Sequence, residues 1–197
     1  MKNYIETERI VMRPINLSDA EDIFEYAKDE DTGPRAGWQP HQNIEETKKI
    51  INMWTSPDCK EVNFAIVYKP DNMVIGTMGY SAKERNNKNN IVQDLIKQGN
   101  KLFEIGFVVS KAYWGMGIAT ECLNAMLNYL FVEEQADIVI TCHAEPNIGS
   151  SKVQDKCGMK IIGCHQNEKP WYNTNNTNHI VRAKTREEWK QEKTKTI

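Results

Sequence analysis

The stretch EIGFVVSKAYWGMGIATECL, Glu104–Leu123, combines a strand, a glycine-containing turn and the beginning of a helix. Its first part is rich in β-branched and aromatic residues, and from Ala119 onward apolar residues recur at helical spacing. Gly115 and Gly117 lie between the two parts. Backbone N–H groups are free at such a helix start, and the helix dipole favours negative charge there. The residues therefore predict either a pyrophosphate site or a simple tight turn.

Two amphipathic helices are predicted on the N-terminal side of this stretch. In the first, NLSDAEDIFEYAKD, the residues Ser18 and Glu21 form a capping-box pattern. The second extends over Ile44–Trp54, with Asn43 as its cap. The intervening residues 33–42, GPRAGWQPHQ, predict a loop.

The rest of the chain predicts a sheet with helical crossovers. Besides a first strand that ends at Pro14, strands are expected at 62–69, 73–80, 102–110, 137–143, 159–165 and 179–184. A short helix at 147–158 is closed by Gly158. Residues 84–100 are polar and Asn-rich, and predict an exposed insertion with one helical turn near Leu95. This order predicts a mixed sheet with helices on both faces, an α/β arrangement in a single domain spanning 1–197.

Composition excludes several classes of function. The formal net charge of -2 and pI near 6.1 give no basic excess, so nucleic-acid binding driven by phosphate neutralisation is not expected. The five cysteines and four histidines lack close ligand spacing, so we predict no metal. The N-terminus has charges where a signal peptide needs an apolar core, and no segment is apolar enough to span a membrane. We therefore expect a cytoplasmic protein that does not bind membranes.

The common nucleotide-binding motifs do not fit the glycine turn. A dinucleotide fingerprint needs a third glycine where Thr120 stands, and an acidic residue at the end of the next strand. That strand ends at His143, and Asp137 lies at its start. The Gly-Lys-Ser/Thr of a P-loop is also absent from the sequence.

Two motifs carry a family resemblance. Residues 104–123 resemble the acetyl-coenzyme A motif of the GNAT N-acetyltransferases, Gln/Arg-x-x-Gly-x-Gly/Ala, with Gly117 and Ala119 in its last two positions and Trp114 in its first. The stretch NIGSSKVQDKCGMK is similar to the family's Asn-x-x-Ser-x-x-Val-x-x-Lys-x-Gly-Phe/Met. Tyr-Trp-Gly before the second glycine resembles the ribosomal-protein N-terminal alanine acetyltransferase (RimJ/RimL-like) branch. The resemblance covers nearly the whole chain outside the insertion.

The resemblance implies a fold and a cofactor. The fold would be α/β (α+β), with a GNAT-type, mostly antiparallel mixed sheet of about seven strands. The activity would be transfer of an acetyl group from acetyl-CoA, as co-substrate and without a metal, to a primary amine by direct attack in a ternary complex. Residues expected at acetyl-CoA are Val108, Val109, Trp114, Gly115, Met116, Gly117, Ile118, Ala119, Thr120 and Asn147.

The chemistry needs a base, an oxyanion donor and a proton for the thiolate. Glu104, on the strand that leads to the turn, is the expected base, acting directly or through a water, and Glu145 is the second candidate. The resemblance implies that the backbone N–H of Val108 donates a hydrogen bond to the oxyanion. Ser150 matches the family serine that hydrogen-bonds or protonates the leaving sulfur. Asn147 matches the family residue that orients the pantetheine arm. Ser150 is also placed to cap the helix, the ordinary use of a serine there.

The acceptor and the partners stay open at this stage. Aromatic residues on predicted loops are candidates for an acceptor pocket or for packing under the loops: Trp38, His41, Trp171 and Tyr172. The acceptor is either a protein N-terminus or a small-molecule amine. A non-catalytic acyl-CoA sensor and a transferase of longer acyl groups are the alternatives. A homodimer is compatible with the family.

Overall fold

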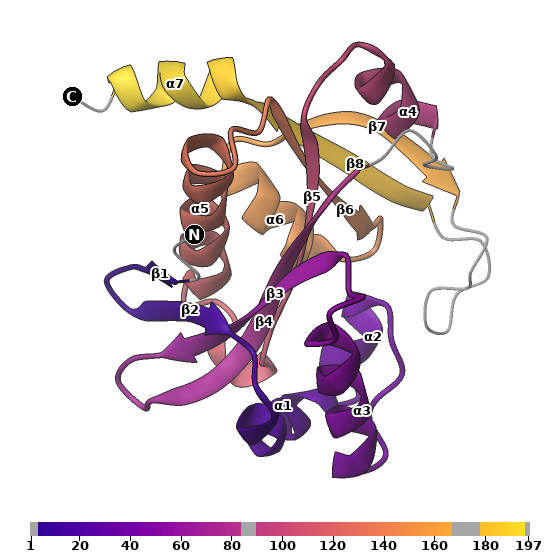
Figure 1. Cartoon of the computed structure of the whole chain (residues 1–197), viewed down its shortest axis with the longest axis vertical. Coiled ribbons are helices and arrows are strands. Elements are labelled where there is room, and N and C mark those ends of the chain that lie inside the picture. The colour runs from indigo at the N-terminus through magenta and orange to yellow at the C-terminus, as the bar shows by residue number, and fades with distance from the viewer. Residues whose placement is uncertain (1–3, 84–89, 167–177, 196–197) are drawn as a thin grey trace.

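The computed structural model describes residues 4–83, 90–166 and 178–195. Within these residues a single sheet has the strand order β1-β2-β3-β4-β5-β6-β8-β7 (Figure 1). The strands are β1 (Ile5–Glu6), β2 (Ile10–Pro14), β3 (Glu61–Tyr68), β4 (Met73–Ala82), β5 (Leu102–Val109), β6 (Ile138–Ala144), β7 (Lys160–Gln166) and β8 (Asn178–Thr185). Neighbouring strands are antiparallel except β5 and β6, which are parallel. The expected mixed, mostly antiparallel sheet is confirmed, with the two-residue β1 as an added strand.

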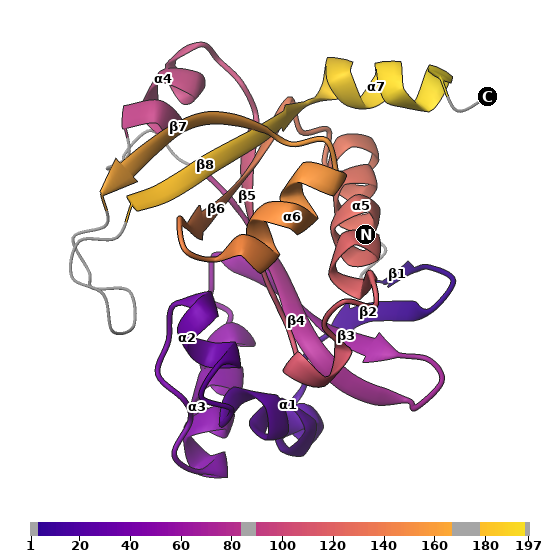
Figure 2. The same ribbon diagram turned by 180° about the vertical axis from the view of Figure 1, so that it is seen from behind.

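Helices cover both faces of the sheet (Figures 1 and 2). They are the 3₁₀ turns η1 (Leu17–Asp19) and η2 (Lys111–Tyr113) and the helices α1 (Ala20–Ala27), α2 (Thr32–Ala36), α3 (Ile44–Trp54), α4 (Asn90–Lys97), α5 (Ile118–Val132), α6 (Ile148–Lys156) and α7 (Arg186–Lys195). The apolar stripe of α5 packs with Phe103, Ile105 and Val109 of β5 in one core cluster. The opposite side of β5 contributes Val108 to the cluster of α1 and α3, so β5 is buried on both faces.

The structure corrects the expected start of the first helix. The chain enters α1 through η1, and the capping box is formed by Asn16 and Asp19 rather than by Ser18 and Glu21. Asn16 accepts a hydrogen bond from the backbone N–H of Ser18, and Asp19 accepts one from the backbone N–H of Asn16. The observed capping box lies before the predicted one because a 3₁₀ turn precedes the regular helix.

Two segments contain more helix than expected. The predicted loop 33–42 begins within α2, where Asp29 accepts from the backbone N–H of Thr32 and Gly37 ends the helix at φ 95°. In the insertion, α4 buries Val92 and Ile96, which lie four residues apart and pack in a cluster with residues of β5, β6 and β8. Helix α7 was also not predicted. α4 packs on apolar residues contributed by distant strands, which local patterns do not report.

The parallel pair β5–β6 separates halfway along its length. The strands pair from Leu102 with Ile138 to Ile105 with Thr141, and residues 106–109 of β5 continue alongside β4 alone. β6 continues alongside β8 as far as Ala144. The backbone of β5 therefore has unpaired groups beside a gap between the two strands, next to the glycine turn.

Candidate functional site

Two clefts meet at the unpaired end of β5. The first, of about 430 Å³, lies between the end of β5, the glycine turn, the start of α5, α6 and α2. The second, of about 290 Å³, lies between β3, β4, β5 and the segment that carries Trp38. Both clefts are lined by Ala36, Phe107 and Val108. A group bound in one cleft can therefore reach a group bound in the other at this position.

Most of the residues expected at acetyl-CoA line the first cleft. They are Val108, Val109, Trp114, Gly115, Gly117, Ile118, Ala119, Thr120 and Asn147; the expected acid Ser150 lines it as well. Met116 does not line it. Three cations that the sequence analysis missed do: Arg35 of α2 and Lys152 and Lys156 of α6. The two lysines are four residues apart, so the predicted helix at 147–158 already places them on one face. No sequence pattern pointed to Arg35 as a site residue.

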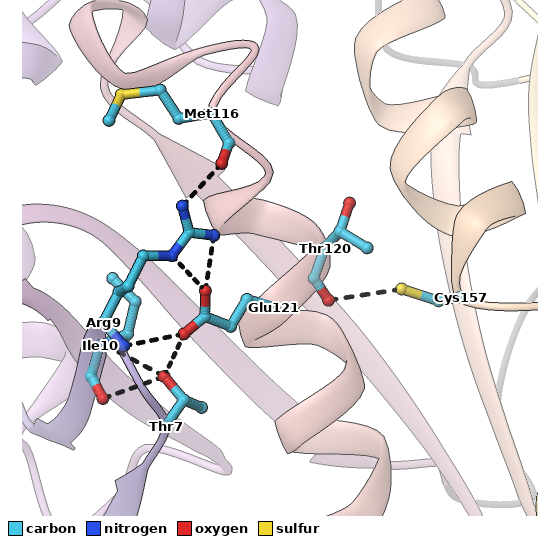
Figure 3. A network of polar contacts seen from close by, with 7 residues as sticks. All are labelled: Thr7, Arg9, Ile10, Met116, Thr120, Glu121 and Cys157. Atoms are coloured by element: carbon cyan, nitrogen blue, oxygen red, sulfur yellow. Dashed lines mark hydrogen bonds and ion pairs between the residues drawn. The ribbon is translucent and has the colours of Figure 1, made fainter. Parts of the chain in front are cut away.

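The glycine turn lines the first cleft and is held from behind by Arg9. Gly115 and Gly117 both have φ 78°, a conformation that favours glycine, and Gly117 is the N-cap of α5 without a side-chain cap. The carbonyl of Met116 accepts a hydrogen bond of 2.9 Å from Arg9 Nη1 (Figure 3). In a trans peptide the N–H points opposite to the preceding carbonyl. The Gly117 N–H therefore points away from Arg9, and Gly117 lines the first cleft.

A network of polar contacts holds this turn and the start of α5 against β2 (Figure 3). Glu121 Oε1 accepts from Thr7 Oγ1 at 2.6 Å and from the Arg9 backbone N–H at 3.1 Å, and Glu121 Oε2 pairs with the Arg9 guanidinium at 2.7 Å. We call Thr7, Arg9 and Glu121 the clamp. Partial burial alone would raise the pKa of Glu121, but the bonds from Thr7 and Arg9 outweigh it and lower that pKa. The stability that this carboxylate contributes is thus present above the ordinary glutamate pKa and lost as pH falls through the lowered value.

Asn147 and Trp114 are held by backbone groups at the rim of the first cleft. Asn147 Oδ1 accepts from the Ser150 N–H at 3.1 Å, and its Nδ2 donates to the Arg35 carbonyl at 2.8 Å. Trp114 Nε1 donates to the Val109 carbonyl at 2.7 Å, and its ring lies under the Arg35 guanidinium at 5.4 Å. Both side chains therefore fix the positions of α2, α6 and the turn around the cleft.

The second cleft contains the expected base. Its floor follows the sheet register, in which Glu61, Ser81 and Glu104 lie in one row across β3, β4 and β5. Gly79 and Gly106 form the adjacent row, and no atom of the described residues lies within 4 Å of a Cβ built on Gly106. Asn63 of β3 continues this row and its side chain covers Gly79, so the hollow beside Glu104 is open at Gly106.

Glu104 is partly exposed and paired. One carboxylate oxygen contacts Lys83 Nζ at 2.5 Å. The thiol of Cys142 on β6 lies beside the same carboxylate, and burial first, then the Glu104 charge, raise the pKa of that thiol. Cys142 therefore stays a protonated thiol at neutral pH.

The structure corrects the expected oxyanion donor. The Ser110 N–H donates to the Ile75 carbonyl at 2.7 Å, which directs the Ser110 backbone toward β4. Backbone direction alternates along a strand, so the Val108 N–H also faces β4. The backbone groups of Phe107 and Val109 face the gap beside β6. Val108 thus lines both clefts through its side chain, while the amides next to it face the open side.

Several other expected site residues lie away from the two clefts or outside the described residues. Glu145 is exposed, and its Oε2 accepts from Asn178 Nδ2 at 3.2 Å. His41 Nδ1 and Thr47 Oγ1 are 2.8 Å apart, so the histidine ties its loop to α3, and burial lowers its pKa. Trp171 and Tyr172 fall outside the described residues. Of the four aromatic candidates, Trp38 lines the second cleft, together with Trp54, which the sequence analysis treated only as part of a helix face.

Two features are absent from the described residues, a metal-ligand cluster and a membrane-spanning helix. Across 4–83, 90–166 and 178–195 there is no cluster of three or more histidine, cysteine, aspartate or glutamate side chains suited to a metal ion. In the same residues no helix combines the length and the apolar character that crossing a bilayer requires.

Known proteins match this chain in sequence and in fold. Residues 9–160 match the family described as the acetyltransferase (GNAT) domain. The chain is 27% identical over 127 residues to the Bacillus licheniformis protein named "Uncharacterized N-acetyltransferase p20", a match that covers 64% of each chain.

Solved structures share the fold. A GNAT-family acetyltransferase from Bacillus anthracis superposes with a TM-score of 0.73 at 23% identity, covering 93% of this chain and 99% of that one. The ribosomal-protein-S5-alanine acetyltransferase of Vibrio fischeri gives 0.67 at 20% identity, covering 94% and 98%. The family match extends from β2 to the first residue of β7 and includes both motifs around the first cleft. The chain therefore belongs to the GNAT acetyltransferases, a family of enzymes that use acetyl-CoA.

Proposed function

We propose that the protein transfers the acetyl group of acetyl-CoA to a primary amine by direct attack in a ternary complex. The observation that carries this proposal is the meeting of two clefts at Phe107 and Val108. The first would hold acetyl-CoA, with its pyrophosphate at the glycine turn and near the cations of α2 and α6. The second would hold the amine. The thioester and the nucleophile would then meet beside the unpaired backbone of β5.

The residues around the junction supply the groups that the reaction needs. The amine nitrogen attacks the thioester carbonyl, and a β5 amide that faces the gap, of Phe107 or Val109, donates to the developing oxyanion. Glu104 takes the amine proton, through a water because it lies three residues from Phe107 along the strand. When the C–S bond breaks, Ser150 gives its hydroxyl proton to the thiolate.

The second cleft points to an amine with an apolar portion. Trp38 and Trp54 line it together with Glu61, Asn63 and residues of the sheet floor. A peptide N-terminus, as in the ribosomal-protein branch that the sequence resembles, and a small-molecule amine are the two acceptor classes. An acceptor assay separates the two classes.

The test is calorimetric titration of acetyl-CoA followed by an acceptor panel. We expect binding in the micromolar range, then release of free thiol with one class among N-terminal peptides and small amines. Binding with no thiol release across a broad panel, propionyl- and butyryl-CoA included, would support a sensor instead. Absence of binding would contradict the assignment of the first cleft.

The clamp gives a second prediction. Arg9→Met removes the donor to the Met116 carbonyl and leaves the Glu121 carboxylate, in the first turn of α5, without its cationic partner. Both changes disfavour an anion at the turn, and because Arg9 is partly exposed we expect acetyl-CoA to bind about 3- to 10-fold more weakly. Calorimetry measures the change. Arg13→Met, which breaks a comparable pair with Asp19 away from both clefts, is the control and should leave the affinity unchanged.

A further inference from the structure

A buried glutamine lies directly behind Ser150. Gln154, one helical turn further along α6, is 0% exposed, and its Nε2 donates to Ser150 Oγ at 2.9 Å. The same nitrogen lies 3.3 Å from Thr141 Oγ1 of β6. Its Oε1 lies 2.8 Å from Nδ1 of His143, also on β6. Every polar group of the Gln154 amide therefore has a partner, although the side chain is surrounded by protein.

The bond from Gln154 decides how the Ser150 hydroxyl can be used. A hydroxyl has one proton to donate and two lone pairs, and an amide nitrogen can only donate. One lone pair of Ser150 Oγ is thus occupied by the Gln154 N–H, and the hydroxyl proton is not spent on this contact. Ser150 lines the first cleft, so that proton is available to a group bound there.

His143 fixes the orientation of the amide. An amide oxygen only accepts, so His143 Nδ1 must carry the proton that is donated to Gln154 Oε1. His143 is 6% exposed, and burial lowers its pKa more strongly than the bond to Gln154 raises it. The neutral histidine therefore supplies a constant donor at neutral pH, and the amide nitrogen stays turned toward Ser150.

We propose that Gln154, held by His143, is a positioning residue that aims the Ser150 hydroxyl proton at the leaving sulfur of coenzyme A. This rests on the proposed function, in which Ser150 is the acid. As the C–S bond breaks, the proton moves from Ser150 Oγ to the thiolate, and the Gln154 N–H stabilises the negative charge that develops on Oγ. A water in the cleft returns a proton to Ser150 before the next turnover. A residue that acts in this way should affect the rate of transfer and not the binding of acetyl-CoA.

The test is a double-mutant cycle with Gln154→Met and Ser150→Ala. Methionine keeps the length of the side chain but donates no hydrogen bond. In the wild-type background we expect Gln154→Met to lower kcat by about 3- to 10-fold, the worth of one hydrogen bond, with the KM for acetyl-CoA within about twofold. In the Ser150→Ala background it should lower kcat no further. An equal loss in both backgrounds, or no loss in the wild type, would overturn the proposal.

A second variant keeps the test decisive if methionine disturbs folding. Gln154→Glu has the same shape, but its carboxylate accepts a bond from Ser150 and draws the hydroxyl proton away from the cleft. We expect kcat to fall further than in Gln154→Met, and an unchanged kcat would contradict the proposal. The control is Thr185→Val, which removes side-chain hydrogen bonds to Glu188 outside both clefts and should leave kcat unchanged.

The outcomes also separate this proposal from the proposed function. If the wild type releases no thiol with any acceptor, the transferase assignment fails, and this proposal fails with it. If the wild type is active and Ser150→Ala is as active as the wild type, the transferase assignment stands, while both Ser150 as acid and Gln154 as its positioning residue are wrong. Activity that depends on Ser150 but not on Gln154 rejects the positioning role alone.

Discussion

Glu104→Gln is expected to lower kcat by about 10²- to 10⁴-fold, the usual contribution of a positioned general base. Glutamine keeps the shape of the side chain but cannot take a proton from the attacking amine. The KM for acetyl-CoA should change little, since Glu104 lines the second cleft and not the first. Steady-state kinetics at one fixed pH measure both quantities.

Glu145→Gln is the matched control for this experiment. Glu145 was the second candidate base in the sequence, but its side chain is exposed and bonded to Asn178 outside both clefts. We expect its kcat to stay within about twofold of the wild type, as for most surface substitutions. A large loss in Glu145→Gln together with an active Glu104→Gln would reverse the assignment of the base.

Gly117→Val is expected to weaken acetyl-CoA binding by at least about tenfold, or about 1.4 kcal/mol. The reason is backbone conformation rather than a collision. A Cβ at this position would have only Arg9 Nη2 as a neighbour in the described residues, at 3.7 Å, but Gly117 has φ 78°, which a β-branched residue strongly disfavours. Relief of that strain changes the backbone of the turn that lines the first cleft. Calorimetry on the folded variant measures the loss.

Gly99→Val separates lost binding from general strain. Gly99 has φ 84°, and no described atom lies within 4 Å of its Cβ position, so valine meets the same backbone conflict there without crowding. Gly99 follows α4 and lines neither cleft. We expect both variants to lose thermal stability and only Gly117→Val to lose affinity. Equal affinities for the two variants would contradict the phosphate role of the turn.

Local sequence patterns predicted the elements that depend on neighbours along the chain. The glycine turn, the helix 44–54 with its Asn43 cap and the hairpin of β3 and β4 could be predicted because propensity, capping and turn chemistry act within a few residues. Helix α2 was not predicted, and only one turn of α4, near Leu95, was expected, because a helix of this length is stabilised mainly by what it packs against.

Around the first cleft, too, some residues could be predicted from local sequence and others could not. Residues of the glycine turn and of α6 could be assigned from their motifs. Arg35 could not, because it reaches the cleft from α2, a helix far from both motifs in the sequence. The sequence also does not show which backbone amides of β5 face β4, since this depends on the register between β4 and β5.

The sequence by itself determined the family, the glycine turn and the candidate base and acid, because each is identified by particular residue types at fixed short spacings. Only the tertiary structure decided which groups act on them. Arg9 and Glu121 are 112 residues apart and meet through β2 and α5, and Gln154 and His143 meet across α6 and β6. Such pairs form when packing of helices on the sheet brings distant segments together. No local pattern encodes that proximity, because it is a property of the whole fold.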